Sequence, residues 1–191
     1  MSELKTTPID KDDLVAALDA VFRRRGYEGA TLSELSRACG LSKASLYHHF
    51  PGGKEEMAHA LLRRAVAELN HRAYRQLERP APWHERLTGF IEGFSDYCHA
   101  GERNCLLAEL AATAARGKFI DEIERQTQAW LHQLSSVFAE TGISAKRARR
   151  RALELQNSLY GALVMARLSN DTKPFRQTIR RLRRGVAREV R

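Results

Sequence analysis

Two adjacent histidines, His48 and His49, stand just before a Pro-Gly-Gly-Lys segment that ends at Lys54. Paired histidines are typical of metal sites, and a glycine-lysine segment is typical of phosphate-binding loops. Neighbouring residues on a helix point about 100° apart, so the two imidazoles cannot jointly face one metal ion. The glycines also lack the preceding strand that a nucleotide-binding loop requires. The remaining chemistry is a phosphate facing Lys54 and the free amides of a helix start.

A second group, Cys98, His99 and Cys105, could hold a metal or undergo redox chemistry. The alternative is that cysteines on helices are small buried hydrophobes, and with Cys39 their number is odd and their spacing irregular, which does not suit a disulfide framework. No Ser/His/Asp order and no cluster with metal-ligand spacing is found elsewhere. We therefore expect no catalytic residue, no metal and no cofactor, and an enzyme is not favoured.

The charge of the chain is concentrated near its C-terminus. The net charge is +9, and Lys and Arg outnumber Asp and Glu by 14 to 3 in residues 146–191, against 13 to 11 in residues 1–80 and 5 to 9 in residues 81–145. Such an excess favours an anionic partner such as nucleic acid. The arginines of residues 176–189 are also compatible with the solvated face of a helix, because apolar residues recur there every three or four positions.

Membrane and secreted classes are not favoured by the sequence. No run of about 18 apolar residues is present, and the first residues lack the basic-then-apolar layout of a secretion signal. We expect a cytoplasmic protein with no membrane partner.

The hydrophobic pattern predicts an all-α fold, because apolar residues recur at helical spacing and period-two runs rich in Val, Ile and Thr are missing. A first helix is predicted from about Asp10 to Arg25, with Gly26 as its stop. Thr31 and Glu34 have the spacing of a capping box, which opens a second helix that Gly40 ends. Ser42 is placed to cap a third helix of barely two turns, residues 43–50.

Two short helices separated by Cys-Gly-Leu-Ser have the layout of a helix-turn-helix, in which the second helix enters the DNA major groove. The apolar residues of this segment should pack together beneath the first helix: Leu35, Leu41, Leu46 and Phe50 under Leu18 and Phe22. The outer side of the third helix then forms a binding face: Lys43, Ala44, Ser45, Tyr47 and His48.

The order of these residues resembles the N-terminal domain of the TetR family of bacterial transcriptional regulators. The matching positions are Phe22, Gly26-Tyr27, Thr31, Leu35, Gly40-Leu41-Ser42, Leu46-Tyr47, His49-Phe50 and Lys54. The resemblance implies a DNA-binding domain over residues 8–70, with the helix-turn-helix at about 31–50, and a larger helical effector-binding and dimerisation domain over residues 80–191. The His-His-Phe-Pro-Gly-Gly-Lys segment is similar to a branch of the family whose repressors respond to flavonoids and other aromatic compounds.

The resemblance also implies roles for the matched residues. Thr31, Tyr47 and Lys54 would contact DNA phosphates, which positions the domain. Lys43, Ala44 and Ser45 would read base edges, with His48 at the outer edge of that face. The implied function is a ligand-responsive regulator, expected to be a repressor that binds a palindromic operator as a homodimer and is released by a small effector. The alternative is a non-specific architectural protein that binds nucleic acid through its arginine-rich end.

Beyond the first domain, six further helices are predicted, at residues 54–79, 83–99, 104–116, 119–140, 145–169 and 174–191. The last two are the dimer candidates, because a stripe of small and apolar residues suits close helix packing. The candidate interface residues are Ala148, Ala152, Leu155, Leu159, Ala162 and Ala166, with Ile179, Leu182 and Val186 from the final helix. Internal packing within one chain is the alternative, because every such stripe must be buried against something.

An effector pocket is expected among the middle helices. Its candidate wall consists of aromatic residues: Phe90, Phe94, Tyr97, Trp130 and Tyr160. Aromatic residues at helical spacing also form plain cores, so this alternative stays open. The expected mechanism is a population shift, in which the effector favours a state whose recognition helices no longer match the DNA.

Overall fold

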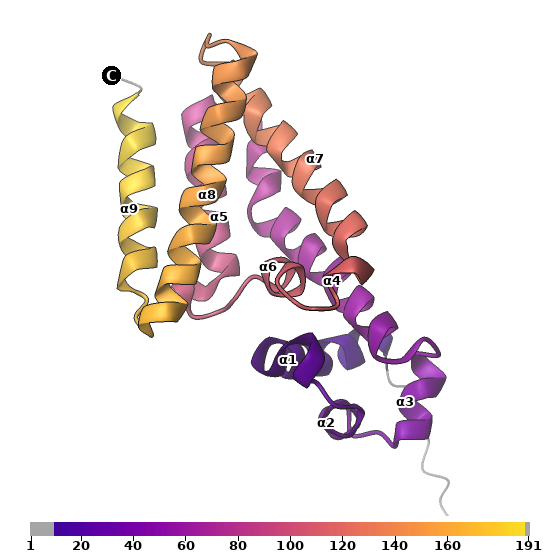
Figure 1. Ribbon diagram of the computed structural model, residues 1–191. Helices are drawn as coiled ribbons and strands as arrows, with labels where there is room; N and C mark the ends of the chain where they lie inside the picture. The colour runs from indigo at the N-terminus through magenta and orange to yellow at the C-terminus, as the bar shows by residue number, and fades with distance from the viewer. Residues whose placement is uncertain (1–9, 190–191) are drawn as a thin grey trace, which may run out of the picture. The chain divides into compact units, whose positions relative to one another are not determined.

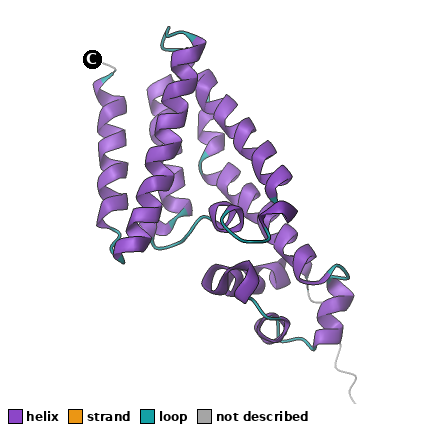
Figure 2. Cartoon of the chain, viewed as in Figure 1, coloured by secondary structure: helices purple, strands orange, loops and turns teal. Residues whose placement is uncertain are grey.

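The computed structural model describes residues 10–189, and every element within that range is a helix (Figure 2). The predicted all-α fold is confirmed. The α-helices are α1 (Lys11–Gly29), α2 (Leu32–Ala38), α3 (Lys43–His49), α4 (Gly53–Arg72), α5 (Trp83–Tyr97), α6 (Leu106–Ala111), α7 (Ile120–Ala139), α8 (Ala145–Ser169) and α9 (Lys173–Arg188), with 3-10 helices at Tyr74–Glu78, His99–Gly101 and Arg116–Lys118. Residues 8–9 of the expected first domain and residues 190–191 of the expected last helix lie outside the described residues. No described helix has the length and hydropathy that a bilayer crossing requires.

The chain divides into two compact units. The first contains the residues up to Arg64 together with Leu106–Ile120, and the second contains Ala65–Cys105 and the residues from Asp121 onward. The division differs from the expected domains 8–70 and 80–191 in two respects: the boundary falls at Arg64 within α4, and α6 with the turn after it belongs with the N-terminal helices. The sequence pattern contains no sign of this, since α6 is far from α1 along the chain and contacts it only in the fold.

The first unit is built around α1. Gly26 has a φ of 69°, so the predicted stop is present as a left-handed kink, and a further helical segment continues to Gly29. This kink places the buried Tyr27 ring 6.2 Å from Phe22 and 5.1 Å from Phe119, which follows α6 in the chain. The aromatic contacts therefore join α1 to the segment that returns from the middle of the sequence.

The second unit shows where α4 ends. One helix was expected from residue 54 to residue 79, but α4 ends at Arg72 and a 3-10 helix follows from Tyr74. The reason is a close approach of α5: a Cβ atom at Gly93 would lie 1.9 Å from the carbonyl oxygen of Arg72. Only glycine allows this contact, and the turn that results buries Tyr74 and Leu77 in the core.

The last two helices, α8 and α9, run beside each other in the second unit (Figure 1). Ser144 caps α8 by accepting a hydrogen bond from the Arg147 amide, and Asn170 ends it in a left-handed conformation with a φ of 50°. The predicted bounds of α8, residues 145–169, are confirmed. α9 also contacts α5, and it buries Phe175 and Ile179.

Candidate nucleic-acid interface

Hydrogen bonds define the starts of α2 and α3. The Thr31 hydroxyl accepts a bond from the Glu34 amide at 3.2 Å, and the Glu34 carboxylate accepts one from the Thr31 amide at 3.5 Å, so the predicted capping box is present. Ser42 caps α3 by accepting from the Ser45 amide at 3.1 Å. Between the two helices, Gly40 has the left-handed φ of 64° that the tight turn needs. Local sequence therefore determines the turn between the two helices.

The apolar side of α3 rests on a closed support. Leu46 and Phe50 are fully buried, as are Leu35 of α2 and Leu18 of α1, while Leu41 is half-buried. The Ser36 hydroxyl donates to the Leu41 carbonyl, which fixes the turn from below. This support leaves the opposite side of α3 to solvent.

The solvent-facing side of α3 contains most of the predicted contact residues. Lys43, Ala44 and His48 are exposed, and the Tyr47 side chain is 43% exposed although it is large and apolar. Ser45 differs from the others, because it is half-buried and its hydroxyl lies 2.9 Å from that of Ser42. Ser45 thus takes part in the cap of its own helix.

The paired histidines diverge as predicted. His48 is exposed and His49 is half-buried, and their rings lie 5.8 Å apart at 78°. Within residues 10–189 no three His, Cys, Asp or Glu side chains come together in a group that could hold a metal ion. The pair has no further ligand with which to form a metal site.

The start of α4 is arranged differently from the expectation of free amides. The Glu56 carboxylate accepts from the Gly52 amide at 2.9 Å and from Lys11 at 3.2 Å, so this amide is already satisfied. The hydrogen bond from the Gly52 amide holds the pKa of Glu56 below its usual value. An acidic residue in the first turn of a helix is the common intramolecular substitute for an anion.

Lys54 is held against the first helix. Its ammonium group lies 4.7 Å from the centre of the Tyr27 ring and donates to the Glu28 carbonyl at 3.4 Å. Gly53, next to it, has a φ of 64°, and a Cβ atom there would meet the Tyr47 ring at 3.2 Å. The turn after α3 therefore braces Tyr47 and Lys54 from the same backbone segment.

The five aromatic residues expected to line a pocket are packed in the core of the second unit. Phe90, Phe94, Tyr97 and Trp130 are buried, and Tyr160 is half-buried with its ring 5.2 Å from that of Phe94. These positions agree with the alternative of plain core packing, because the aromatic rings are buried and Phe94 packs against Tyr160.

Tyr74, which sequence reasoning missed, connects this aromatic core. Its ring stacks on Trp130 at 4.6 Å and meets Phe90 at 4.9 Å, while its hydroxyl accepts from Gln156 at 3.3 Å. Trp130 in turn donates to Asn70 at 2.6 Å. Aromatic residues make up only 7% of the sequence, and Tyr74 lay inside the helix predicted to continue to residue 79, so no local signal marked it.

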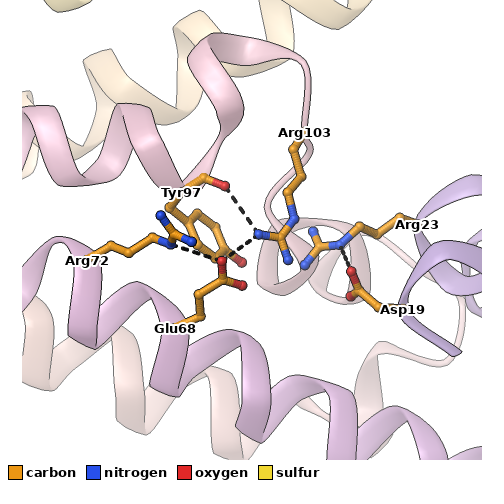
Figure 3. Close-up of polar contacts among 6 residues, drawn as sticks. All are labelled: Asp19, Arg23, Glu68, Arg72, Tyr97 and Arg103. Carbon is orange, nitrogen blue, oxygen red and sulfur yellow. Dashed lines mark hydrogen bonds and ion pairs between the residues drawn. The ribbon is translucent and has the colours of Figure 1, made fainter. Parts of the chain in front are cut away.

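A polar cluster that sequence reasoning also missed lies beside Tyr97. Figure 3 shows the Glu68 carboxylate between two guanidinium groups, with Arg103 donating at 2.8 Å and Arg72 at 3.0 Å. Arg103 also lies 5.1 Å from the centre of the Tyr97 ring. Burial acts to raise the pKa of Glu68, but the two arginines outweigh it and the pKa lies below its usual value. Charge is thus held at the edge of an aromatic core.

Cys98, His99 and Cys105 show no common site. Both cysteines are buried and outside any disulfide, and the Cys105 sulfur lies 4.0 Å from the Tyr160 hydroxyl. His99 is exposed in a left-handed turn with a φ of 46°. The description of the cysteines as small buried side chains fits these positions.

The small-residue stripe of α8 faces the interior of its own unit. The stripe residues and their counterparts on α9 are buried or half-buried within one chain: Ala148, Ala152, Leu155, Leu159, Ala162, Ala166, Ile179, Leu182 and Val186. Seven of these nine side chains are buried by the chain itself, and Leu182 and Val186 keep part of their surface open to solvent. The alternative of internal packing describes them.

Several apolar side chains on the opposite side of α8 are exposed. Leu168 is 74% exposed, Val164 and Met165 are about half exposed, and Leu153 is 39% exposed. Gly161 lies among them with open space above it. We call these five residues the α8 outer face. A signal for it existed, since residues 162–168 contain apolar residues around the whole helix.

Comparison with known proteins agrees with this architecture. Residues 14–61 match the family model described as bacterial regulatory proteins of the tetR family. Residues 85–181 match the model for the C-terminal domain of LmrA/YxaF-like transcriptional regulators.

Relatives and solved structures extend over nearly the whole chain. The HTH-type transcriptional regulator LmrA of Bacillus subtilis is 22% identical, covering 86% of this chain and 90% of its own. A TetR transcriptional regulator from Chloroflexus aurantiacus superposes with a TM-score of 0.78 at 20% identity, over 93% of both chains. AibR, solved in complex with isovaleryl coenzyme A and operator DNA, superposes with a TM-score of 0.63 at 18% identity, over 79% of this chain and 85% of its own.

The relatives are transcriptional regulators, not enzymes. With a helix-turn-helix at one end, a family model over about half of its length and the same fold in solved regulators, the chain belongs to the TetR family of bacterial transcriptional regulators.

Proposed function

We propose that this protein is a ligand-responsive repressor that binds a palindromic operator as a homodimer and is released by a small effector. The observation that carries the proposal is the exposed side of α3, where Lys43, Tyr47 and His48 project from a helix held rigidly by its cap and its buried leucine. A helix that reads base edges must be fixed in this way, because a small displacement breaks bidentate hydrogen bonds. Family membership supports the same role.

Phosphate and base contacts divide between two sets of residues. Thr31, at the start of α2, and Tyr47 and Lys54, around the turn after α3, are the phosphate contacts in this proposal. Lys43 donates to guanine, and the small Ala44 allows close approach or meets a thymine methyl group. Lys54 exchanges its bond with the Glu28 carbonyl for a phosphate, which is a modest change because that bond is long.

The α8 outer face is the dimer surface in this proposal. Exposed apolar patches on a soluble chain mark interaction sites, and Gly161 allows two helices to approach closely. A two-fold dimer explains a palindromic operator, because each recognition helix reads one half-site. Replacing Leu168 with Glu should convert the dimer to a monomer in sedimentation experiments, whereas the same change at the exposed His132 of α7 should not. Dimers that persist in Leu168→Glu would exclude this face.

The aromatic core of the second unit is the proposed effector site. Phe90, Phe94, Tyr97, Trp130 and Tyr160 supply apolar contact, and the Glu68–Arg103 pair beside Tyr97 supplies charge. Small-molecule sites combine an apolar wall with a few polar groups in this way. Binding would require the packed rings to rearrange, which gives the effector unequal affinity for two states. AibR, which has this fold, holds isovaleryl coenzyme A and operator DNA in one complex.

The test starts from genomic DNA selected by the purified protein and a mobility-shift titration at fixed salt. Tyr47→Ala and Tyr47→Phe should both weaken operator binding by about tenfold, because each removes a hydroxyl bond to a charged phosphate. Tyr47→Phe retains the ring against Gly53, so its melting temperature should match that of the wild type. Unchanged affinity in both variants would count against the assignment. Higher expression from the selected promoter on deletion of the gene identifies a repressor, and lower expression contradicts that role.

A further inference from the structure

One surface of the second unit is strongly charged and takes no part in the function proposed above. It lies on α9 and consists of seven exposed cations, which we call the α9 cationic face: Lys173, Arg176, Arg180, Arg181, Arg183, Arg184 and Arg188. Lys173–Arg188 contains no acidic residue. Seven positive charges therefore lie on a helix about 24 Å long, at 1.5 Å per residue.

The apolar side of α9 is already used. Phe175 is fully buried, Ile179 nearly so, and Leu182 and Val186 are half-buried. The helices that α9 contacts are α5 and α8 (Figure 1). A basic amphipathic helix on a membrane must bury its apolar side in lipid, and here that side is occupied by the core. Only the cationic face can meet a partner.

The charge of this face is largely uncompensated. Arg183 pairs with Glu92 of α5 at 2.9 Å, but the described residues place no carboxylate in ion-pair contact with Arg180, Arg181 or Arg184. Arg180, Arg183 and Arg184 line a hollow of about 370 Å³ beside Thr88. Across residues 146–189 cations outnumber carboxylates by 13 to 3, whereas the rest of the described chain holds 17 against 19. Folding thus concentrates positive charge on one surface of the second unit.

From these observations we infer that the α9 cationic face binds the sugar-phosphate backbone of double-stranded DNA without reading its sequence. The linear charge densities are comparable, because seven cations over the helix give one charge per about 3.4 Å, and each DNA strand carries one phosphate per about 3.4 Å of the duplex axis. A protein partner would need aromatic or apolar anchors in the centre of the patch, and the face offers only Ala187. A second copy of α9 would oppose like charges. Backbone binding needs only cations, and its strength comes from the release of condensed counterions.

The test uses the full-length protein and a labelled 30-base-pair duplex of random sequence, in anisotropy titrations from 50 to 200 mM salt. Arg180→Gln/Arg184→Gln should reduce the slope of log affinity against log salt by about 0.9 for each phosphate that is no longer neutralised, so by nearly 2 for the pair. Across this fourfold range of salt, the affinity of the variant should therefore fall about tenfold less than that of the wild type. The matched control is Arg75→Gln/Arg125→Gln, which removes two exposed arginines of the same unit outside α8 and α9. Its slope should equal that of the wild type.

An unchanged slope in Arg180→Gln/Arg184→Gln, with a melting temperature equal to that of the wild type, overturns the inference. The inference is also overturned if Arg180→Gln/Arg184→Gln weakens binding to phosphatidylglycerol vesicles or to an acidic protein and leaves binding to the duplex unchanged. Ala44→Leu separates this inference from the proposed function, because a larger side chain at this proposed base contact should reduce operator preference yet leave the salt slope on random duplex unchanged. If the protein prefers its operator and the α9 variant has the wild-type salt slope, the proposed function is supported and the inference about α9 is wrong. If the α9 variant has a reduced salt slope and the protein shows no operator preference, the inference about α9 is supported and the proposed function is wrong.

Discussion

The helix pairs α2–α3 and α8–α9 are built by the same local devices and present opposite kinds of surface. Each pair is joined by a left-handed residue, Gly40 with a φ of 64° and Asn170 with a φ of 50°, and each contains a helix capped by a serine hydroxyl. Yet residues 32–49 contain two cations and one carboxylate, and residues 145–188 contain 13 cations and two carboxylates. The backbone signals are shared, and the outward side chains differ.

This difference corresponds to two modes of DNA binding, base recognition and backbone binding. A helix that discriminates between bases needs varied side chains in fixed positions, and additional charge would only strengthen binding to every sequence equally. A surface that holds the backbone needs charge and little positional accuracy. The two pairs should therefore respond to different perturbations: α3 to changes in its support, and α9 to salt.

The largest effects should come from truncating the buried leucine of each pair. Leu46, on the buried side of α3, and Leu159 of α8 are both essentially inaccessible, so replacement by Ala should lower the free energy of unfolding by about 2–5 kcal/mol in either case. Urea titrations measure this loss. The comparison predicts that only Leu46→Ala also removes operator preference, at a temperature where both variants are folded. Equal loss of preference in Leu159→Ala would show that the base-reading surface depends on α8 as well.

The next effect concerns the turns. No atom lies near a Cβ added at Gly40, so Gly40→Ala should cost only the strain of a left-handed backbone, about 1 kcal/mol. Asn170→Ala should lower the free energy of unfolding by a similar amount, because alanine tolerates the left-handed conformation less well than asparagine does. Asn170→Gly should change it by about 0.3 kcal/mol at most. Thermal or urea unfolding distinguishes these outcomes. A larger loss in Asn170→Gly than in Asn170→Ala would mean that the asparagine side chain, and not the turn, supports α8–α9.

Much of the first unit could be predicted from the sequence because its signals are local. Thr31 with Glu34, Gly40 and Ser42 act within three or four residues of one another, and each was found where predicted. The bounds of α8 were also found as predicted. Caps and left-handed turns need no information from the rest of the fold.

The errors arose where distant segments meet. The end of α4 at Arg72 depends on Gly93, which approaches from another helix and has no local signal. The surface that covers the α8 stripe could not be predicted. Helical periodicity shows that Leu155 and Leu159 must be buried, but it does not show which surface buries them. Likewise, the amides at the start of α4 were expected to be free for a phosphate, and Glu56 accepts from the Gly52 amide there. In each case the outcome depends on a tertiary contact that the local sequence does not specify.

The smallest predicted effect tests whether the capping box of α2 contributes as a charged pair. The bond from the Thr31 amide is the main cause of the lowered pKa of Glu34 in the folded state. A carboxyl with a lowered folded pKa contributes stability above the unfolded value of about 4.3, and this contribution is lost as the pH falls through the folded pKa. Glu34→Gln retains the reach to the Thr31 amide but cannot titrate.

The stability advantage of the wild type over Glu34→Gln, measured in urea, should therefore be present at pH 7 and should shrink below pH 4. Operator affinity at neutral pH should barely change, because the cap geometry is retained. A difference that stays constant from pH 7 to pH 3 would show that the bond is made equally well by a neutral side chain. In that case α2–α3 would be positioned by hydrogen-bond geometry alone, and its contrast with the charge-dependent α9 would become sharper still.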